Sequence, residues 1–269
     1  MDAPVEAPAE NATRAAGRLA ARSLTVRAGA RELVRELSIE FAPGEVLAVL
    51  GRNGSGKTLT LHTLAGLRAP AGGEVQLDGQ PLMQLKRRAV AQRLGLLPQD
   101  VEDAFVTTAL ESVLIGRHPH LALWQWETAE DERLALDALA AVDMLGCATR
   151  RTDTLSGGEQ RRVAVAALLA QQPGIFLLDE PTNHLDPHHQ LVVLGLFREL
   201  ARAGRTVITT LHDPTLAARF ADRVLLLFGD GRWSSGPVAS TLTAAALSEL
   251  YLAPIIELSQ DGRRVFVSA

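Results

Sequence analysis

The stretch Glu45–Thr58, EVLAVLGRNGSGKT, decides the fold of this chain, because it joins a buried strand to a helix through a glycine-rich turn. Residues 51–58 match the pattern G-x-x-x-x-G-K-[ST] in full. The apolar run before the loop is typical of a central strand, and the LTLHTLAGL that follows has helical spacing. Glycines let successive backbone N–H groups point inward at phosphate oxygens, and the helix N-terminus adds partial positive charge. We therefore predict a nucleotide phosphate site.

The residue types of this loop predict how it holds the nucleotide. Lys57 should reach the β- and γ-phosphates, and the Thr58 hydroxyl should ligate Mg²⁺. The residues expected to contact the nucleotide are Gly51, Arg52, Asn53, Gly54, Ser55, Gly56, Lys57, Thr58 and Leu59.

A second apolar strand, in IFLLDEPTNHLD at 175–186, delivers two carboxylates at its carboxyl end. Ligands bind at that end in open α/β sheets. Asp179 is placed to hold Mg²⁺, and Glu180 to polarise an attacking water. His212 ends a further apolar strand, TVITTLH, so a phosphate contact is the better interpretation there. The plainer alternatives are a solvated Asp-Glu turn and a structural histidine.

The order of the segments predicts an α/β fold with a mostly parallel core sheet. SLTVRAG and ELSIEFAPGE alternate as antiparallel strands, and EVQLDG is hairpin-like. Helical patterns dominate 101–172, so we expect an all-helical subdomain inserted there in the α/β core, within a single domain over 17–269. IIELSQDGRRVFVS should close the chain as a hairpin around Asp261-Gly262.

Composition excludes several classes of protein. A net charge of −4 disfavours a general nucleic-acid binder, and the basic pairs, Arg161-Arg162 among them, are expected to be solvated helix faces. The single cysteine, Cys147, fits a reducing compartment and shows no catalytic setting. Residues 1–16 are acidic and rich in Ala and Pro, which predicts a disordered tail. With no apolar run of 18 residues, we expect a cytosolic chain that meets the membrane only through a partner.

A second glycine motif, DTLSGGEQRR at 153–162, lies about a hundred residues after the phosphate loop. Ser156, Gly157 and Gly158 precede a helix that begins near Glu159, which makes another anion-binding helix terminus. One nucleotide needs only one phosphate cradle, so the second motif needs an explanation.

Together these motifs resemble the nucleotide-binding subunit of ABC transporters, from about residue 20 to the C-terminus. The resemblance rests on Gly51–Thr58, Gln99 in LLPQD, LSGGE at 155–159, FLLDE at 176–180, and NHLD at 183–186 with His212. It implies a P-loop ATPase that uses ATP and Mg²⁺. It also implies that LSGGE closes over the γ-phosphate held by a second copy of the chain, so that two ATP molecules are enclosed in a head-to-tail dimer.

The resemblance also implies the remaining roles. Ser156, Gly157, Gly158 and Glu159 contact the partner's ATP, and Asp186 lines the dimer seam. The resemblance makes Gln99 a contact of Mg²⁺ and of the water. His212 is the switch that senses the γ-phosphate. Catalysis is then expected from Glu180, His212, Gln99 and Lys57, and Mg²⁺ ligation from Thr58, Gln99 and Asp179. One position departs from the family: Ala28 stands where an aromatic residue stacks on adenine, which puts stacking and base selectivity in doubt.

VLIGRHPHL and DEPTNHLDPHHQ resemble the metal-chelate importer group, which takes up ferric siderophores, haem or cobalamin. This implies a separate integral membrane permease, an indirect substrate-binding protein, and a position at the cytoplasmic face of the inner membrane. The resemblance places His118 and His120 near the permease, with Arg117 and Trp124. Direct metal binding by the histidines is disfavoured, because Asp186-Pro187 separates His184 from the helix that carries His188 and His189. The alternatives are a soluble ATPase of the superfamily acting on ribosomes or DNA, and a nucleotide-gated scaffold without turnover.

Overall fold

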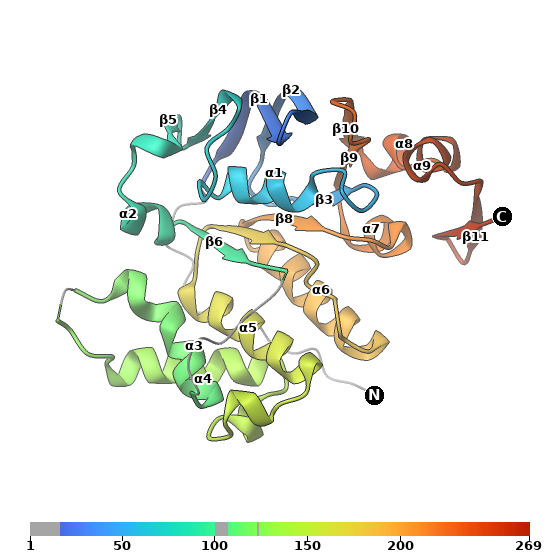
Figure 1. The fold of residues 1–269 in the computed structure, drawn as a ribbon. Helices are drawn as coiled ribbons and strands as arrows, with labels where there is room; N and C mark the ends of the chain where they lie inside the picture. Colours follow the sequence, from blue (N-terminus) through green and yellow to red (C-terminus); the bar gives the residue numbers. More distant parts are fainter. Residues whose placement is uncertain (1–16, 100–106, 123) are drawn as a thin grey trace.

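The computed structural model describes residues 17–99, 107–122 and 124–269, and its elements form three layers (Figure 1). The expected tail at 1–16 and the first residues of the expected insertion, 101–106, lie outside the described part. A six-stranded sheet lies in the middle, with a smaller antiparallel sheet and α1 (Lys57–Leu64) on one side and most of the helices on the other.

The central sheet carries the strand ends at which the predicted site lies. Its order is β10-β9-β3-β8-β7-β6, and the five strands from β9 to β6 run parallel. The strands are β3 (Val46–Leu50), β6 (Leu94–Leu97), β7 (Ile175–Leu178), β8 (Thr206–Thr210), β9 (Arg223–Leu227) and β10 (Trp233–Pro237). The mostly parallel P-loop core is therefore confirmed. The antiparallel edge strand β10 was not predicted, because WSSGP has no apolar alternation.

The N-terminal strands form the predicted antiparallel part. Its order is β2-β1-β4-β5, with strands β1 (Leu19–Ala28), β2 (Arg31–Phe41), β4 (Gly72–Leu77) and β5 (Gln80–Pro81). Leu19 pairs with Phe41 and Ala28 with Arg31, so β1 and β2 form a hairpin. The short helices η1 (Leu82–Gln84) and α2 (Arg87–Ala91) follow.

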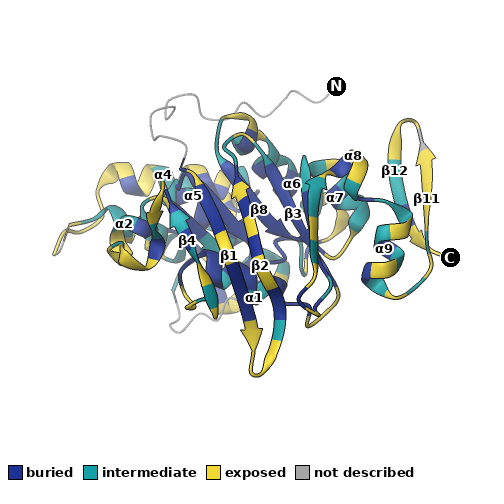
Figure 2. Ribbon diagram, turned by 90° about the horizontal axis from the view of Figure 1, so that it is seen from above, coloured by how far each residue is buried: buried dark blue, intermediate teal, exposed yellow. Residues whose placement is uncertain are grey.

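Alternation along the buried strands divides the interior into two cores. In β3, Leu47 and Val49 face the antiparallel sheet and α1, while Val46, Ala48 and Leu50 face the helices on the other side. Both faces are covered, so the strand is buried throughout, as a parallel strand requires. The central strands are dark blue in Figure 2 for this reason.

The segment that follows β6 is helical. Its described residues, 107–122 and 124–171, form only helices and the loops between them, apart from an isolated bridge between Thr108 and Arg151. The helices are α3 (Ala109–Leu114), η2 (Ile115–His120), α4 (Ala129–Ala141), η3 (Leu145–Cys147), η4 (Thr152–Thr154) and α5 (Gly157–Gln171). Three of them begin with capping boxes, at Thr108, Thr128 and Ser156, in which the cap side chain and the third helical residue bond each other's backbone N–H. These local signals explain why the helices begin where they do.

The remaining elements complete the helical side of the central sheet and the C-terminal end of the chain. They are α6 (Pro187–Arg202), α7 (Pro214–Phe220), α8 (Val238–Thr241), α9 (Ala244–Tyr251), β11 (Ile255–Gln260) and β12 (Arg263–Ser268). The predicted hairpin around Asp261-Gly262 is confirmed, and it projects from the molecule beside α9 (Figure 2). None of the helices in the described part of the chain is both long and apolar enough to cross a bilayer.

Candidate functional site

The phosphate loop needs glycine at particular positions. Gly54 and Gly56 adopt φ angles of +76° and +102°, in the left-handed region that other residues rarely occupy. A Cβ on Gly51 would lie 2.6 Å from the Leu227 carbonyl oxygen, so the loop packs directly on the end of β9. Gly56 caps α1, whose first residue is Lys57. The loop therefore places backbone N–H groups and a lysine at one helix terminus.

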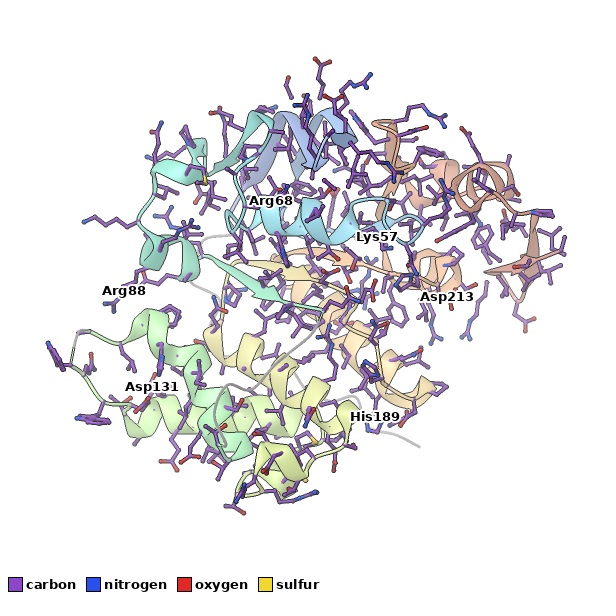
Figure 3. All side chains as sticks on the ribbon, in the orientation of Figure 1. Lys57, Arg68, Arg88, Asp131, His189 and Asp213 are labelled. Atoms are coloured by element: carbon purple, nitrogen blue, oxygen red, sulfur yellow. The ribbon has the colours of Figure 1, made fainter. Side chains whose placement is uncertain are left out.

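Lys57 lies buried at the start of α1 (Figure 3). Its Nζ donates a 2.9 Å hydrogen bond to the carbonyl of Gly51. Burial lowers the pKa of the ammonium, and the negative charges of Glu180 and Asp179 oppose that shift. A buried cation beside two carboxylates is well placed to bind a polyanion together with a divalent metal.

The strand ends of β7 and β8 build the acidic part of the site. Asp179 is fully buried, and its Oδ1 accepts a 2.7 Å hydrogen bond from Thr210 Oγ1. The same Thr210 oxygen accepts a 2.8 Å hydrogen bond from the Glu180 backbone N–H. One hydroxyl therefore holds both acidic residues, and no motif in the sequence indicated this role for Thr210.

Glu180 is held at both carboxylate oxygens. Its Oε1 contacts His212 Nε2, and its Oε2 accepts a hydrogen bond of 2.5 Å from Asn183 Nδ2. The Glu180 carboxylate is almost fully buried, whereas His212 is about half exposed. The backbone of Glu180 adopts φ +50°, an unfavourable value for a non-glycine residue. Such outliers cluster at functional sites because the surrounding structure must hold them.

These groups meet in one cavity of about 540 Å³, within the size range of small-molecule sites. Its lining comprises Ala28, Leu33, Asn53, Gly54, Gly56, Lys57, Thr58, Leu59, Gln99, Glu180 and His212. The structure thus brings together loop residues, Gln99, Glu180 and His212, which are far apart in the sequence. Gly51, Arg52, Ser55 and Asp179 are not part of the lining. Ala28 lies in the cavity wall, where the departure from the family pattern was noted.

The donor set fits Mg²⁺. Asp179 Oδ2 is buried and has no hydrogen-bond partner among the described residues, although such an acceptor is costly to bury without one. Hard divalent cations prefer carboxylate, hydroxyl and amide oxygens. Asp179, Thr58 and Gln99 supply those three types of oxygen.

The second glycine motif lies apart from this cavity. Ser156 caps α5: its Oγ accepts from the Glu159 N–H at 3.3 Å, and the Ser156 N–H donates to Glu159 Oε2 at 2.7 Å. The backbone N–H of Ser156 is the largest cause that lowers the pKa of the Glu159 carboxyl. Ser156 and Gly157 are exposed, and none of residues 156–159 lines the cavity.

Asp186 is the N-cap of α6, where its carboxylate accepts from the backbone N–H of His189 at 2.9 Å and contacts the imidazole Nδ1 at 2.8 Å. Pro187 starts the helix, so His184 lies outside it, as expected. His184 and His188 consequently do not share a helix face. Among the described residues there is no group of three or more His, Cys, Asp or Glu side chains that could hold a metal ion.

Two arginines are buried within the molecule. The position of Arg117 near the permease stays a prediction, and its side chain points inward: its Nε bonds Asp131 Oδ1 at 2.8 Å and its Nη1 donates to the Ala170 carbonyl at 2.7 Å. Arg161 was expected on a solvated face, yet it is 4% exposed. Its guanidinium donates to four backbone carbonyls, those of Pro98, Gln99, Asp179 and Glu180. Trp124, in contrast, is 91% exposed.

Comparison with known proteins agrees with this geometry. Residues 34–183 match the family model described as ABC transporter. The chain is 46% identical to the hemin import ATP-binding protein HmuV of Deinococcus radiodurans over 209 residues, which cover 76% of this chain and 78% of that protein.

Two solved structures share the fold. One is described as an inward-facing conformation of a putative metal-chelate type ABC transporter, with a TM-score of 0.81, 28% identity and coverage of 94% and 98% of the two chains. The other is the dimeric structure of MJ0796, a bacterial ABC transporter cassette, with a TM-score of 0.70, 27% identity and coverage of 80% and 97%. The chain therefore belongs to the ABC transporter family and is one of its ATPases.

Proposed function

We propose that this chain is the ATP-hydrolysing subunit of an importer for a metal chelate, and that it works as a head-to-tail dimer on a separate permease. The observation that carries the proposal is the division of the phosphate-binding elements. The cavity contains the phosphate loop, Gln99, Glu180 and His212, while Ser156 and Gly157 lie exposed outside it. A second copy of the chain can supply the missing half of each site.

Within one chain, each residue has a separate part in hydrolysis. The loop N–H groups and Lys57 bind the phosphates of ATP. Glu180 accepts a proton from the water that attacks the γ-phosphorus, while the bond to the β-phosphate oxygen breaks and ADP leaves. His212 contacts the same carboxylate and lines the cavity, so it can report whether the γ-phosphate is present.

Thr58, Asp179 and Gln99 would hold Mg²⁺. Bound there, Mg²⁺ would neutralise the charge that develops on the phosphate oxygens. Thr210 keeps Asp179 in place through its 2.7 Å hydrogen bond, so the metal ligand does not depend on the nucleotide for its orientation.

A complementation experiment tests the shared site. Lys57→Ala removes the phosphate lysine, and Ser156→Arg blocks the exposed helix terminus. Each variant alone is expected to be inactive. In a head-to-tail dimer of the two, one site combines an intact phosphate loop with an intact Ser156, and the other contains both changes. Mixing the variants should therefore restore ATP turnover toward half of the wild-type rate per mixed dimer.

If the mixture stays as inactive as its components, although each binds the wild-type chain, the shared site is wrong. A mixture of Lys57→Ala with Lys57→Met is the matched control, because no pairing of these variants contains an intact phosphate loop.

The importer and its cargo rest on the relatives. HmuV is named for hemin import, and the solved relative for metal-chelate transport. We place the chain at the cytoplasmic face of the membrane, bound to an integral permease that receives cargo from a substrate-binding protein. Ferric siderophores, haem and cobalamin are the candidate cargoes, and hemin is the first to test.

Co-purification distinguishes transport from other uses of ATP. A tag on the N-terminus, followed by mild solubilisation of the host's membranes, should recover a polytopic permease. Reconstitution of that complex in vesicles with hemin should then give ATP-dependent uptake. Recovery only from the soluble fraction, with ribosomes or DNA-repair proteins, would contradict the transport proposal and leave the ATPase intact.

A further inference from the structure

Arg161 connects the second turn of α5 to two segments of the ATP site. Nη1 donates to the Pro98 and Gln99 carbonyls at 2.5 and 3.1 Å, and Nη2 to those of Asp179 and Glu180 at 2.5 and 2.9 Å. The side chain is 4% exposed. Burying a guanidinium costs desolvation free energy, and the four carbonyls that compensate for it are held in a defined arrangement around the side chain.

The two segments follow neighbouring strands of the central sheet. β6 and β7 pair in parallel, with Leu97 opposite Leu178, and the ladder ends where the Asp179 N–H donates to the Leu97 carbonyl at 2.9 Å. Beyond that point, among the residues that the structure describes, no strand pairing joins the two segments. The guanidinium lies between them there, and its planar set of N–H donors suits several carbonyls at once.

Arg161 also supports the strained backbone of Glu180. The Glu180 N–H donates to Thr210 Oγ1, and its carbonyl accepts from Arg161 Nη2, so the peptide groups on both sides of the φ +50° conformation are held. This conformation directs the carboxylate toward His212 and Asn183. Without Arg161 the segment can relax toward an ordinary backbone conformation and move the carboxylate.

We propose that Arg161 is a positioning residue for ATP hydrolysis, which aligns Glu180 and Gln99 with each other and with the N-terminus of α5. The inference rests on the proposed roles of those two residues. Because Gly157 lies one turn before Arg161, the helix that begins with the second glycine motif is bonded directly to the catalytic strand ends. When that helix terminus docks on a partner's nucleotide, Arg161 therefore transmits the docking to Glu180 and Gln99.

Steady-state ATP hydrolysis by the full chain tests this role. Arg161→Lys keeps the charge but cannot reach both segments, and Arg161→Gln removes the charge. Both should lower kcat about 10- to 100-fold, a loss typical of a misplaced catalytic group. KM for ATP should stay within about threefold, because the four hydrogen bonds of the Arg161 guanidinium go to the segments after β6 and β7 and not to the phosphate loop. If Arg161→Gln fails to fold, Arg161→Lys gives the answer.

Arg162→Lys is the matched control on the same helix. Arg162 donates to the carbonyls of Val142 and Asp143, at 3.1 and 3.2 Å, within the helical layer, so kcat should stay within about twofold of wild type. An equal loss in both variants would show a general effect on α5 and overturn the proposal.

A double-mutant cycle with Glu180→Gln separates positioning from stability. When the carboxylate is already absent, Arg161→Lys should reduce the single-turnover rate much less than it does in the wild-type background. A full, additive loss would overturn the positioning role. If Glu180→Gln alone leaves turnover unchanged, the proposed catalytic role of Glu180 is wrong. This result differs from an additive loss, so the experiment distinguishes failure of the Glu180 role from failure of the Arg161 role.

Discussion

Thr210 Oγ1 donates a 2.7 Å hydrogen bond to Asp179 Oδ1, across the ends of two adjacent strands. The same oxygen accepts from the Glu180 N–H. The predicted metal ligand and the predicted base are therefore oriented by one hydroxyl at the end of β8. The central sheet thus contributes directly to the orientation of both groups.

Thr210→Val should therefore lower ATP turnover, with little change in KM. The substitution keeps the shape but leaves a buried carboxylate oxygen and a buried N–H without this partner, which costs about 1–3 kcal/mol. Steady-state kinetics and the free energy of unfolding measure the two effects. Thr209→Val is the control, because Thr209 is also buried in β8 but its hydroxyl donates to the Thr210 carbonyl, at 3.3 Å, and not to an acidic residue. Equal turnover in the two variants would contradict the role of Thr210.

Glu180→Gln should abolish most turnover while ATP still binds. The amide cannot accept the proton from water, so kcat should fall about 10²- to 10⁴-fold. The phosphate loop is unchanged, and the variant should accumulate as an ATP-bound dimer in size-exclusion chromatography with Mg²⁺-ATP. Glu132→Gln, on the exposed face of α4, should behave like wild type. A monomeric Glu180→Gln under saturating ATP would count against the shared site.

Asp131 should make the helical layer sensitive to acid. Burial opposes ionisation of this carboxyl, but hydrogen bonds from Thr128 and the buried Arg117 outweigh it and lower the pKa to about 2. In Figure 3 Asp131 lies in the helical layer, away from Lys57. The folded pKa is below the unfolded value, so the stabilisation is complete above about pH 4 and is lost as the pH falls toward 2.

Asp131→Asn should therefore cost about 2 kcal/mol or more at pH 7, and the difference from wild type should shrink between pH 4 and pH 2. Denaturant titrations at several pH values measure it. Asp137→Asn is the control, since that carboxylate is exposed on the same helix and pairs with Arg133. A difference that stays constant down to pH 2 would rule out the ionised pair as its source.

Ala28→Tyr should strengthen ATP binding. Ala28 lines the cavity, and an aromatic ring there can stack on adenine, for a gain of roughly 2- to 10-fold in Kd. Calorimetric titration with ATP measures the gain, and tripolyphosphate, which has no base, should bind unchanged. Ala30→Tyr, in the exposed turn after β1, is the matched control. A similar gain for tripolyphosphate would exclude base stacking as the cause.

The sequence by itself determined the local elements of this protein. The loop from Gly51 to Thr58, the caps at Ser156 and Asp186, and the apolar strands before Asp179 and His212 are all encoded by neighbours within a few residues. Their physical causes, which are glycine conformation, capping hydrogen bonds and apolar periodicity, act over one turn or one strand. The α/β fold followed from their order along the chain, and the ATPase assignment followed from the resemblance of the motifs to the ABC transporter family.

Only the tertiary structure decided which polar residues are buried, and with which partners. Arg161 and Arg162 are adjacent and identical in type, yet one crosses to the ends of β6 and β7 while the other bonds the helical layer. The partners of Arg161 lie 18 to 63 residues away, and no local pattern encodes a backbone carbonyl. The same holds for Arg117 with Asp131 and for Thr210 with Asp179. A buried polar side chain is stable only where distant segments complete its hydrogen bonds, so its role is set when the chain has folded.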